Sequence, residues 1–123
     1  MKILIIDDED DIRKIARLSL ARVGGMDVVD ASNGPDGVRK AEAERPDAIL
    51  LDVMMPGMDG PATLAMLRAG EATCKIPILF LNAKAMTTEI ERLRALGAVA
   101  VLTKPFDPML LPKQVRQALE EAK

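Results

Sequence analysis

Five short apolar runs punctuate the chain, at residues 2–6, 26–31, 48–51, 76–81 and 98–103. Four of them hold almost no polar member, which is typical of strands buried on both faces of a parallel sheet. The run at 26–31 includes Asp27 and Asp30, so we expect its strand nearer an edge. Each run is therefore predicted to be one strand of a shared sheet.

Apolar residues at helical spacing follow every run. They predict helices over residues 12–23, 38–45, 60–69, 88–96 and 111–119, with turns at 32–35 and 71–75. Thr88 and Glu91 have the spacing of a capping box. Pro112 would break a hydrogen bond beyond a first turn, so the last regular helix is expected to begin near Leu111. Five strand-helix repeats predict an α/β domain with helices on both faces of a parallel sheet and right-handed crossovers.

Length and composition exclude several classes of protein. The chain has 123 residues, of which 49% are apolar, which suits one domain with a real core. A formal net charge of −2 argues against a nucleic-acid-binding surface. With no histidine and only Cys74, a disulfide framework, a Cys/His zinc site and a Ser-His-Asp site are excluded within one chain. No run approaches a membrane span and no signal peptide is evident, so we expect a cytoplasmic protein.

Polar residues stand where four of the predicted strands end. Asp7 and Asp8 follow the first strand, and Asp52 ends the third. Asn82 ends the fourth strand, and Lys104 follows the fifth. Parallel strands bring these side chains to one sheet edge, where ligands bind in open α/β sheets. Crowded carboxylates need a counter-charge such as Mg²⁺. Together with the Lys104 ammonium and the Asn82 amide donor, they predict a phosphoryl site with Asp52 as nucleophile.

Structural alternatives stay open for these charges. Asp52 could cap a helix N-terminus, although Pro56 and Gly57 intervene before any helix could begin. Lys104 could simply neutralise Asp52 in a salt bridge. The remaining acidic residues of the cluster fit the first turn of a helix, where the dipole favours negative charge, and for them we prefer this structural interpretation: Glu9, Asp10 and Asp11.

The sequence resembles the receiver domains of bacterial two-component response regulators over essentially its whole length, as a single domain at residues 1–123. The resemblance rests on IIDD at 5–8, on Asp52 followed by MPGMDG at 55–60, and on KPF at 104–106. Each motif is short, but their order and spacing together are specific. The resemblance implies a flavodoxin-like, doubly wound (βα)5 sandwich with strand order 2-1-3-4-5.

It also implies a chemistry. Asp52 is expected to accept a phosphoryl group from the phosphohistidine of a sensor histidine kinase or histidine phosphotransfer protein. Lys104 would contact the phosphoryl oxygens, and its bond to Pro105 would be cis. We expect a signalling domain rather than an enzyme, with only weak self-dephosphorylation by a water in line with Asp52. The implied Mg²⁺ ligands are Asp7, Asp8, Asp52 and the backbone carbonyl of Met54.

The expected partners are the phosphodonor protein and a downstream protein target, with no nucleic acid and no membrane. Pairing of two copies through the fourth helix, fifth strand and fifth helix stays open. The 123 residues contain no output domain that we can identify, and the chain could be part of a longer protein.

Two positions depart from the family pattern. Asn82 stands where these domains usually carry Thr or Ser, and Val101 stands where they usually carry an aromatic residue or His. An Asn amide can still donate a hydrogen bond, but a valine has no ring to move between exposed and buried positions. Met54 and Lys84 occupy positions that tend to tune dephosphorylation in this family, although both could simply be solvent-facing loop residues.

Three functions remain in view from the sequence. The first is a stand-alone, Mg²⁺-dependent phosphoacceptor that acts by binding partners. The second is a phosphorylation-independent adaptor or a phosphate sink, suggested by Asn82 and Val101. The third is a hydrolase with an aspartate nucleophile, which would need a substrate pocket or cap domain for which this chain has little room.

Overall fold

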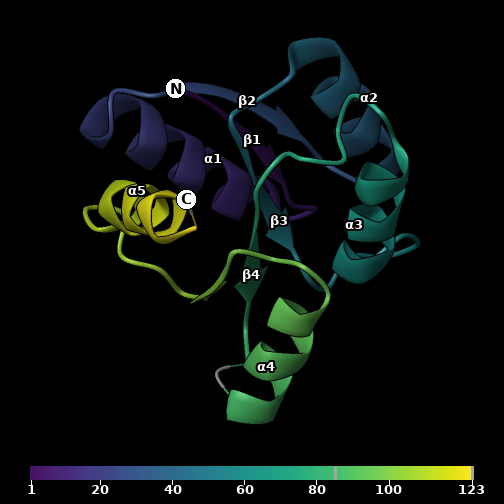
Figure 1. Ribbon diagram of the computed structural model, residues 1–123. Helices are drawn as coiled ribbons and strands as arrows, with labels where there is room; N and C mark the ends of the chain where they lie inside the picture. The colour runs from purple at the N-terminus through teal and green to yellow at the C-terminus, as the bar shows by residue number, and fades with distance from the viewer. Residues whose placement is uncertain (85, 123) are drawn as a thin grey trace.

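The computed structural model describes residues 1–84 and 86–122 and shows strands and helices alternating along the chain (Figure 1). The strands are β1 (Lys2–Ile6), β2 (Asp27–Ala31), β3 (Ala48–Asp52), β4 (Ile78–Asn82) and β5 (Ala100–Thr103). The helices are α1 (Asp10–Leu18), α2 (Gly34–Glu44), α3 (Gly60–Ala69), α4 (Thr87–Ala95) and α5 (Leu111–Glu121), and α1 continues into the π-helical turn η1 (Ser19–Val23). The predicted alternation is confirmed.

All strand pairs are parallel, and the sheet has the order β2-β1-β3-β4-β5. The α/β fold and the strand order implied by the resemblance are therefore confirmed. β2 lies at an edge, as its weaker apolar pattern predicted. β3 lies in the middle of the sheet, and every one of its residues is buried, so Asp52 ends a strand that is enclosed on both faces.

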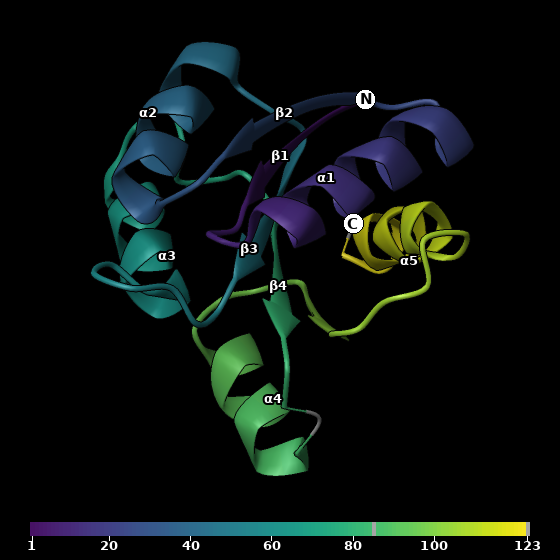
Figure 2. The same cartoon turned by 180° about the vertical axis from the view of Figure 1, so that it is seen from behind.

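Alternate strand residues face two separate cores, one on each side of the sheet. One core joins β1 residues Ile3 and Ile5 to apolar side chains of α1 and α5, including Ala16 and Val115. The other core lies on the opposite face of the sheet, where the alternate residues of the same strands pack against α2, α3 and Leu93 of α4. Figures 1 and 2 show α1 and α5 together on one side, with α2 and α3 on the other. This is the three-layer arrangement that the sequence implied.

Several boundaries differ from the predictions. The capping box at Thr88 is wrong: α4 begins at Thr87, its N-cap is Met86, and no side chain caps it. The turn predicted at 32–35 is partly helical, because Asn33 caps α2 by accepting a hydrogen bond from the Asp36 amide. Ile15 belongs to the apolar stripe that predicted the first helix, but its side chain is exposed rather than buried. By contrast, α5 begins at Leu111, as the position of Pro112 predicted.

No helix among residues 1–84 and 86–122 is long and apolar enough to cross a membrane.

Candidate phosphoryl site

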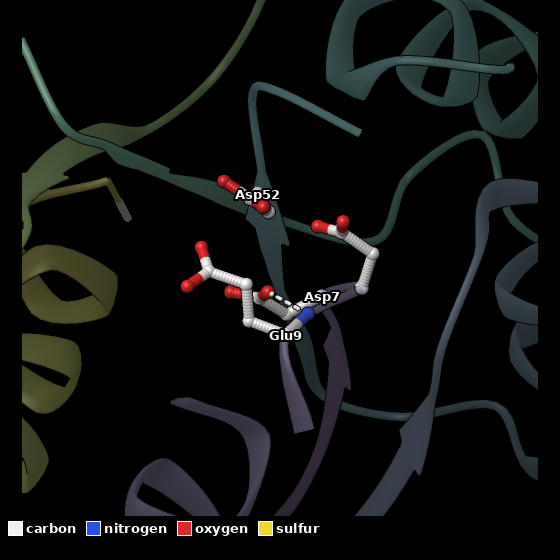
Figure 3. Close-up of side chains that lie close together, drawn as sticks. Asp7, Glu9 and Asp52 are labelled. Atoms are coloured by element: carbon white, nitrogen blue, oxygen red, sulfur yellow. Dashed lines mark hydrogen bonds between the residues drawn. The ribbon is translucent and has the colours of Figure 1, made fainter. Parts of the chain in front are cut away.

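The carboxyl edge of the sheet brings together the charged residues that the strand ends predicted. Asp7 and Asp8 follow β1, Asp52 is the last residue of β3, and Lys104 follows β5. Asp7, Asp8, Glu9 and Asp52 each place a carboxylate oxygen within 4.8 Å of the others. Figure 3 shows Asp7, Glu9 and Asp52 turned toward one another above the strand ends. The cluster therefore contains one acidic residue more than predicted.

Lys104 closes this cluster with its ammonium group. Nζ lies 3.0 Å from Asp7 Oδ2, 3.1 Å from Asp52 Oδ1 and 3.3 Å from Glu9 Oε1. Its side chain is only 11% exposed. The Lys104–Pro105 peptide bond is cis, as the resemblance implied. The salt bridge considered as an alternative for Lys104 and Asp52 is thus present, as one contact of three.

The other alternative for Asp52 is wrong. Asp52 ends β3, and the side chain that caps the following helix is that of Asp59, which accepts a hydrogen bond from the Ala62 amide at 2.9 Å. Asp59 is well placed because Pro61 occupies the first turn, where a missing N–H leaves no bond unmade. Asp52 is therefore free of any local capping role.

Three buried carboxylate oxygens in the cluster lack a hydrogen bond from the described residues: Asp7 Oδ2, Asp8 Oδ1 and Asp52 Oδ2. Asp7 Oδ2 has only its ion pair with Lys104. Buried, unpartnered anionic oxygens are costly, and a single ammonium group cannot neutralise four carboxylates. An oxygen-only donor set of this kind fits a hard cation such as Mg²⁺.

The ionisation of the site reflects this imbalance. Burial, reinforced by the Asp7 charge and only partly opposed by Lys104, raises the pKa of Asp52 from 3.8 to about 6. Burial lowers the pKa of Lys104, but the neighbouring Asp7 and Asp52 carboxylates outweigh burial and leave that pKa above its usual value. Lys104 is therefore a permanent cation, whereas Asp52 holds its negative charge less readily than an ordinary aspartate.

Two contacts hold Asp7 in place. The Glu9 amide donates to Asp7 Oδ1 at 2.8 Å, as the dashed line in Figure 3 marks. Arg13 Nη1 donates to the Asp7 carbonyl oxygen at 2.9 Å. Arg13 also lies within ion-pair distance of Asp10 and Asp30, so it ties α1 and β2 to the end of β1. The sequence did not single out Arg13, because nothing in the spacing shows which way an arginine on α1 points.

The predicted placement of Asp10 and Asp11 in the first turn of a helix is confirmed, whereas Glu9 lies one residue before that turn, at the N-cap. Asp10 and Asp11 occupy the first turn of α1. Glu9 precedes that turn, caps nothing with its side chain, and reaches Lys104 instead. Its extended backbone, with φ −85° and ψ 114°, points the side chain toward the site rather than along the helix.

Gly60 allows the loop after β3 to fold back closely on the acceptor strand. A Cβ at this position would lie 2.5 Å from the Asp52 carbonyl oxygen and 2.8 Å from Val53 Cα. Both neighbours are backbone atoms that cannot turn aside. The Gly60 amide also donates to the Val53 carbonyl oxygen at 2.9 Å. The glycine of the MPGMDG motif therefore serves the packing of α3 against Asp52.

Asn82 and Val101 lie where the strands place them, but among the described residues neither side chain makes a hydrogen bond to the charged side chains of the cluster. Asn82 is buried, and its side-chain amide donates to the Lys84 carbonyl oxygen at 3.0 Å. Val101 is half-buried and packs against the core that contains Leu93. The side chains of Met54 and Lys84 are exposed, which fits either interpretation given for them.

Comparisons with known proteins agree with this architecture. Residues 3–116 match the response regulator receiver domain family. The chain is 39% identical to the alkaline phosphatase synthesis transcriptional regulatory protein PhoP of Bacillus subtilis, over 98% of this chain and 49% of PhoP. It is 35% identical to protein PilG of Pseudomonas aeruginosa, over 86% of this chain and 78% of PilG.

Among solved structures, the chemotaxis protein CheY4 of Vibrio cholerae superposes with a TM-score of 0.87 at 32% identity, covering 95% of this chain and 97% of CheY4. The chain spans about half the length of PhoP and of the Streptomyces coelicolor transcriptional regulatory protein CseB. The sequence match, the fold and the relatives lead to one conclusion. The chain belongs to the response regulator receiver domain family.

Proposed function

We propose that this domain accepts a phosphoryl group on Asp52, with Mg²⁺ bound at the neighbouring carboxylates, and passes the signal on by binding a protein partner. The observation that carries the proposal is the state of Asp52. Its side chain is 4% exposed, Lys104 Nζ lies 3.1 Å from Oδ1, and Oδ2 is buried without a hydrogen-bond partner. A buried carboxylate with an adjacent fixed cation and a free oxygen is suited to act as a nucleophile.

The transfer step balances with a phosphohistidine donor. One Asp52 oxygen forms the new P–O bond as the P–N bond to the donor imidazole breaks, and the electron pair of that bond leaves with the imidazole nitrogen. Lys104 would then turn its ammonium protons toward the phosphoryl oxygens, since three donors on a compact cation suit that charge. Histidine is absent from these 123 residues, so the phosphohistidine lies outside this domain.

Mg²⁺ would be held by Asp7, Asp8, Asp52 and the backbone carbonyl of Met54. The unpartnered oxygens on the three aspartates support this assignment. When bound, the cation would neutralise negative charge shared by the acceptor carboxylate and the phosphoryl group.

The first experiment is phosphorylation by a small donor such as phosphoramidate, followed by intact-protein mass spectrometry. We expect one added phosphoryl group that requires Mg²⁺ and is lost in Asp52→Ala. The matched control is Asp47→Ala, which removes a carboxylate just before the opposite end of the same strand. Phosphorylation that persists in Asp52→Ala, or that never occurs in the wild-type protein, would overturn the proposal.

The proposal includes the partners of the domain. The phosphoryl donor would be a sensor histidine kinase or a histidine phosphotransfer protein, and the phosphorylated domain would bind a downstream protein target. Two copies would pair through α4, β5 and α5. Self-dephosphorylation is expected to be slow. External phosphomonoesters should not be turned over, and turnover by the wild-type protein that is lost in Asp52→Ala would favour the hydrolase instead.

A second candidate is a phosphate sink or a phosphorylation-independent adaptor. Asn82 and Val101 are the two positions that depart from the family pattern. The Asn82 side chain already has a hydrogen-bond partner in the Lys84 carbonyl, and Val101 is packed against the core. A sink would be phosphorylated normally, yet its amide NMR shifts with Mg²⁺ and beryllofluoride, a phosphoryl mimic, would stay near Asp7, Asp52 and Lys104. Shifts that reach α5 would instead favour a switching regulator.

A further inference from the structure

Glu9 stands out as the acidic residue of the cluster whose position has no structural explanation. It occupies the N-cap of α1, where a short side-chain acceptor such as that of Ser or Asp would stabilise the helix. Its carboxylate makes no such bond and instead accepts a hydrogen bond from Lys104 Nζ, 95 residues away, at 3.3 Å. The N-terminus of α1 therefore has no side-chain cap, and the Glu9 side chain contacts the phosphoryl site instead.

The three carboxylates around Lys104 differ in their freedom to leave. Asp7 and Asp52 are buried and fixed at strand ends, with side chains 0% and 4% exposed. The Glu9 side chain is 59% exposed, and its Oε1 lies at the longest of the three distances. Of the three contacts, the one to Glu9 is a hydrogen bond, whereas those to Asp7 and Asp52 are ion pairs. A phosphoryl group that reaches Lys104 competes with these carboxylates for the ammonium charge, and Glu9 is the one whose exposed side chain can turn into solvent.

From this geometry we propose that Glu9 is a placeholder anion: it occupies Lys104 while Asp52 is unmodified, and it competes with the phosphoryl group for the same ammonium. This inference rests on the proposed phosphorylation of Asp52. Glu9 is a positioning residue, because it acts through Lys104 rather than by touching the reacting atoms. The negative charge of Glu9 makes phosphorylation of Asp52 less favourable, because a phosphoryl group brings roughly −1.5 to −2 charges next to it.

The test uses beryllofluoride affinity at saturating Mg²⁺, measured by calorimetry on the full chain. Glu9→Gln keeps the shape of the side chain and removes the competing charge. We expect it to tighten beryllofluoride binding about fivefold, the size of effect that one partly screened charge exerts at this range. Asp11→Asn is the control, because Asp11 also lies in the exposed start of α1 but makes no side-chain ion pair with any described residue.

Mg²⁺ affinity without beryllofluoride separates the competing explanations. A placeholder on Lys104 predicts that Glu9→Gln changes Mg²⁺ affinity by less than about threefold. A tenfold or greater loss of Mg²⁺ affinity would make Glu9 a metal ligand and overturn the inference. So would unchanged or weaker beryllofluoride binding in Glu9→Gln, or equal tightening in Asp11→Asn. If the wild-type protein binds no beryllofluoride at all, the proposed function itself fails, and that outcome is distinguishable from a failure of Glu9 alone.

Discussion

The side-chain amide of Asn82 donates a hydrogen bond to the carbonyl oxygen of Lys84, two residues along the same loop, at 3.0 Å. Asn82 is 2% exposed, so this bond is made in a buried environment where an unmade bond is costly. To contact a phosphoryl group on Asp52, the amide has either to use its second N–H proton while the first stays on the Lys84 carbonyl, or to release that carbonyl. The loop after β4 is thus held in its present form by Asn82.

Replacing Asn82 with Thr should extend the response to a phosphoryl mimic. A shorter hydroxyl side chain cannot hold the Lys84 carbonyl in the same way, so the loop is free to follow the phosphoryl group. We expect beryllofluoride to shift amide signals of β5 and α5 more in Asn82→Thr than in the wild-type protein, with Mg²⁺ present in both. Equal shifts in the two proteins would show that Asn82 does not restrain the loop.

Lys104 should stabilise the metal-free fold. Its ammonium offsets two buried carboxylates, at 3.0 Å from Asp7 and 3.1 Å from Asp52, so Lys104→Met leaves their repulsion uncompensated. We expect a loss of about 3 kcal/mol in unfolding free energy in EDTA, measured by urea denaturation near neutral pH. Saturating Mg²⁺ should recover most of that loss, because the cation binds only the folded state and replaces the missing charge.

The control for this prediction is Lys14→Met, which removes an exposed ammonium group from the neighbouring helix α1. It should change stability by less than about 0.5 kcal/mol, with or without Mg²⁺. If Lys104→Met is no less stable than this control in EDTA, then the carboxylates do not depend on Lys104 for compensation.

Asp52 should make metal-free stability depend on pH. Its folded-state pKa of about 6 lies above its ordinary value of 3.8, so the folded protein ionises this group less readily than the unfolded chain. At about pH 4 Asp52 is protonated in the folded state and costs little. As the pH rises from about 4 to about 6, the unfolded chain releases this proton while the folded state retains it, so the cost grows and levels off above pH 6 at about 2–3 kcal/mol. Asp52→Asn, which never ionises, should escape this cost.

Denaturation curves for the two proteins in EDTA test the sign. The stability advantage of Asp52→Asn should be largest near pH 7.5 and should shrink toward zero near pH 4. The difference between the proteins isolates Asp52 from the other carboxylates that titrate in both. An advantage that is constant with pH, or that grows in acid, would contradict this assignment of the pKa.

The fold was predictable because its determinants are local and repetitive. Uninterrupted apolar runs such as that of β3 mark strands buried on both faces, and their alternation with helical stripes leaves few arrangements other than a parallel sheet. The edge position of β2 followed from two aspartates. Helix boundaries were less predictable: Thr88 and Glu91 have capping-box spacing, yet α4 begins one residue earlier without any side-chain cap.

The charged site was predictable only as far as strand ends could locate it. Asp7, Asp52 and Lys104 come together because parallel strands end at one edge. The part played by Glu9 depends on a side-chain direction and a contact across 95 residues, which sequence spacing does not encode. The same holds for Asn82, whose position the strand fixes but whose hydrogen-bond partner is set by the path of the following loop.

Arg13 should control how precisely Asp7 is positioned among the carboxylates of the site. Its guanidinium donates to the Asp7 carbonyl oxygen at 2.9 Å and pairs with Asp10 at 2.6 Å and Asp30 at 3.4 Å. A planar fork with several donors can serve these partners at once, whereas a lysine ammonium at the end of a flexible stem cannot. Arg13→Lys keeps the charge and loses this geometry, so it separates positioning from electrostatics.

We expect Arg13→Lys to weaken Mg²⁺ binding about threefold to tenfold, and to lower the free energy of unfolding by about 1 kcal/mol through the lost hydrogen bond to Asp7. Mg²⁺ affinity is measured by NMR titration, and stability by urea denaturation. Arg17→Lys is the matched control, because Arg17 is more exposed and reaches only Asp30, at 3.4 Å. If both variants bind Mg²⁺ as the wild-type protein does, then Arg13 contributes only its charge, and the Glu9 amide alone suffices to orient Asp7.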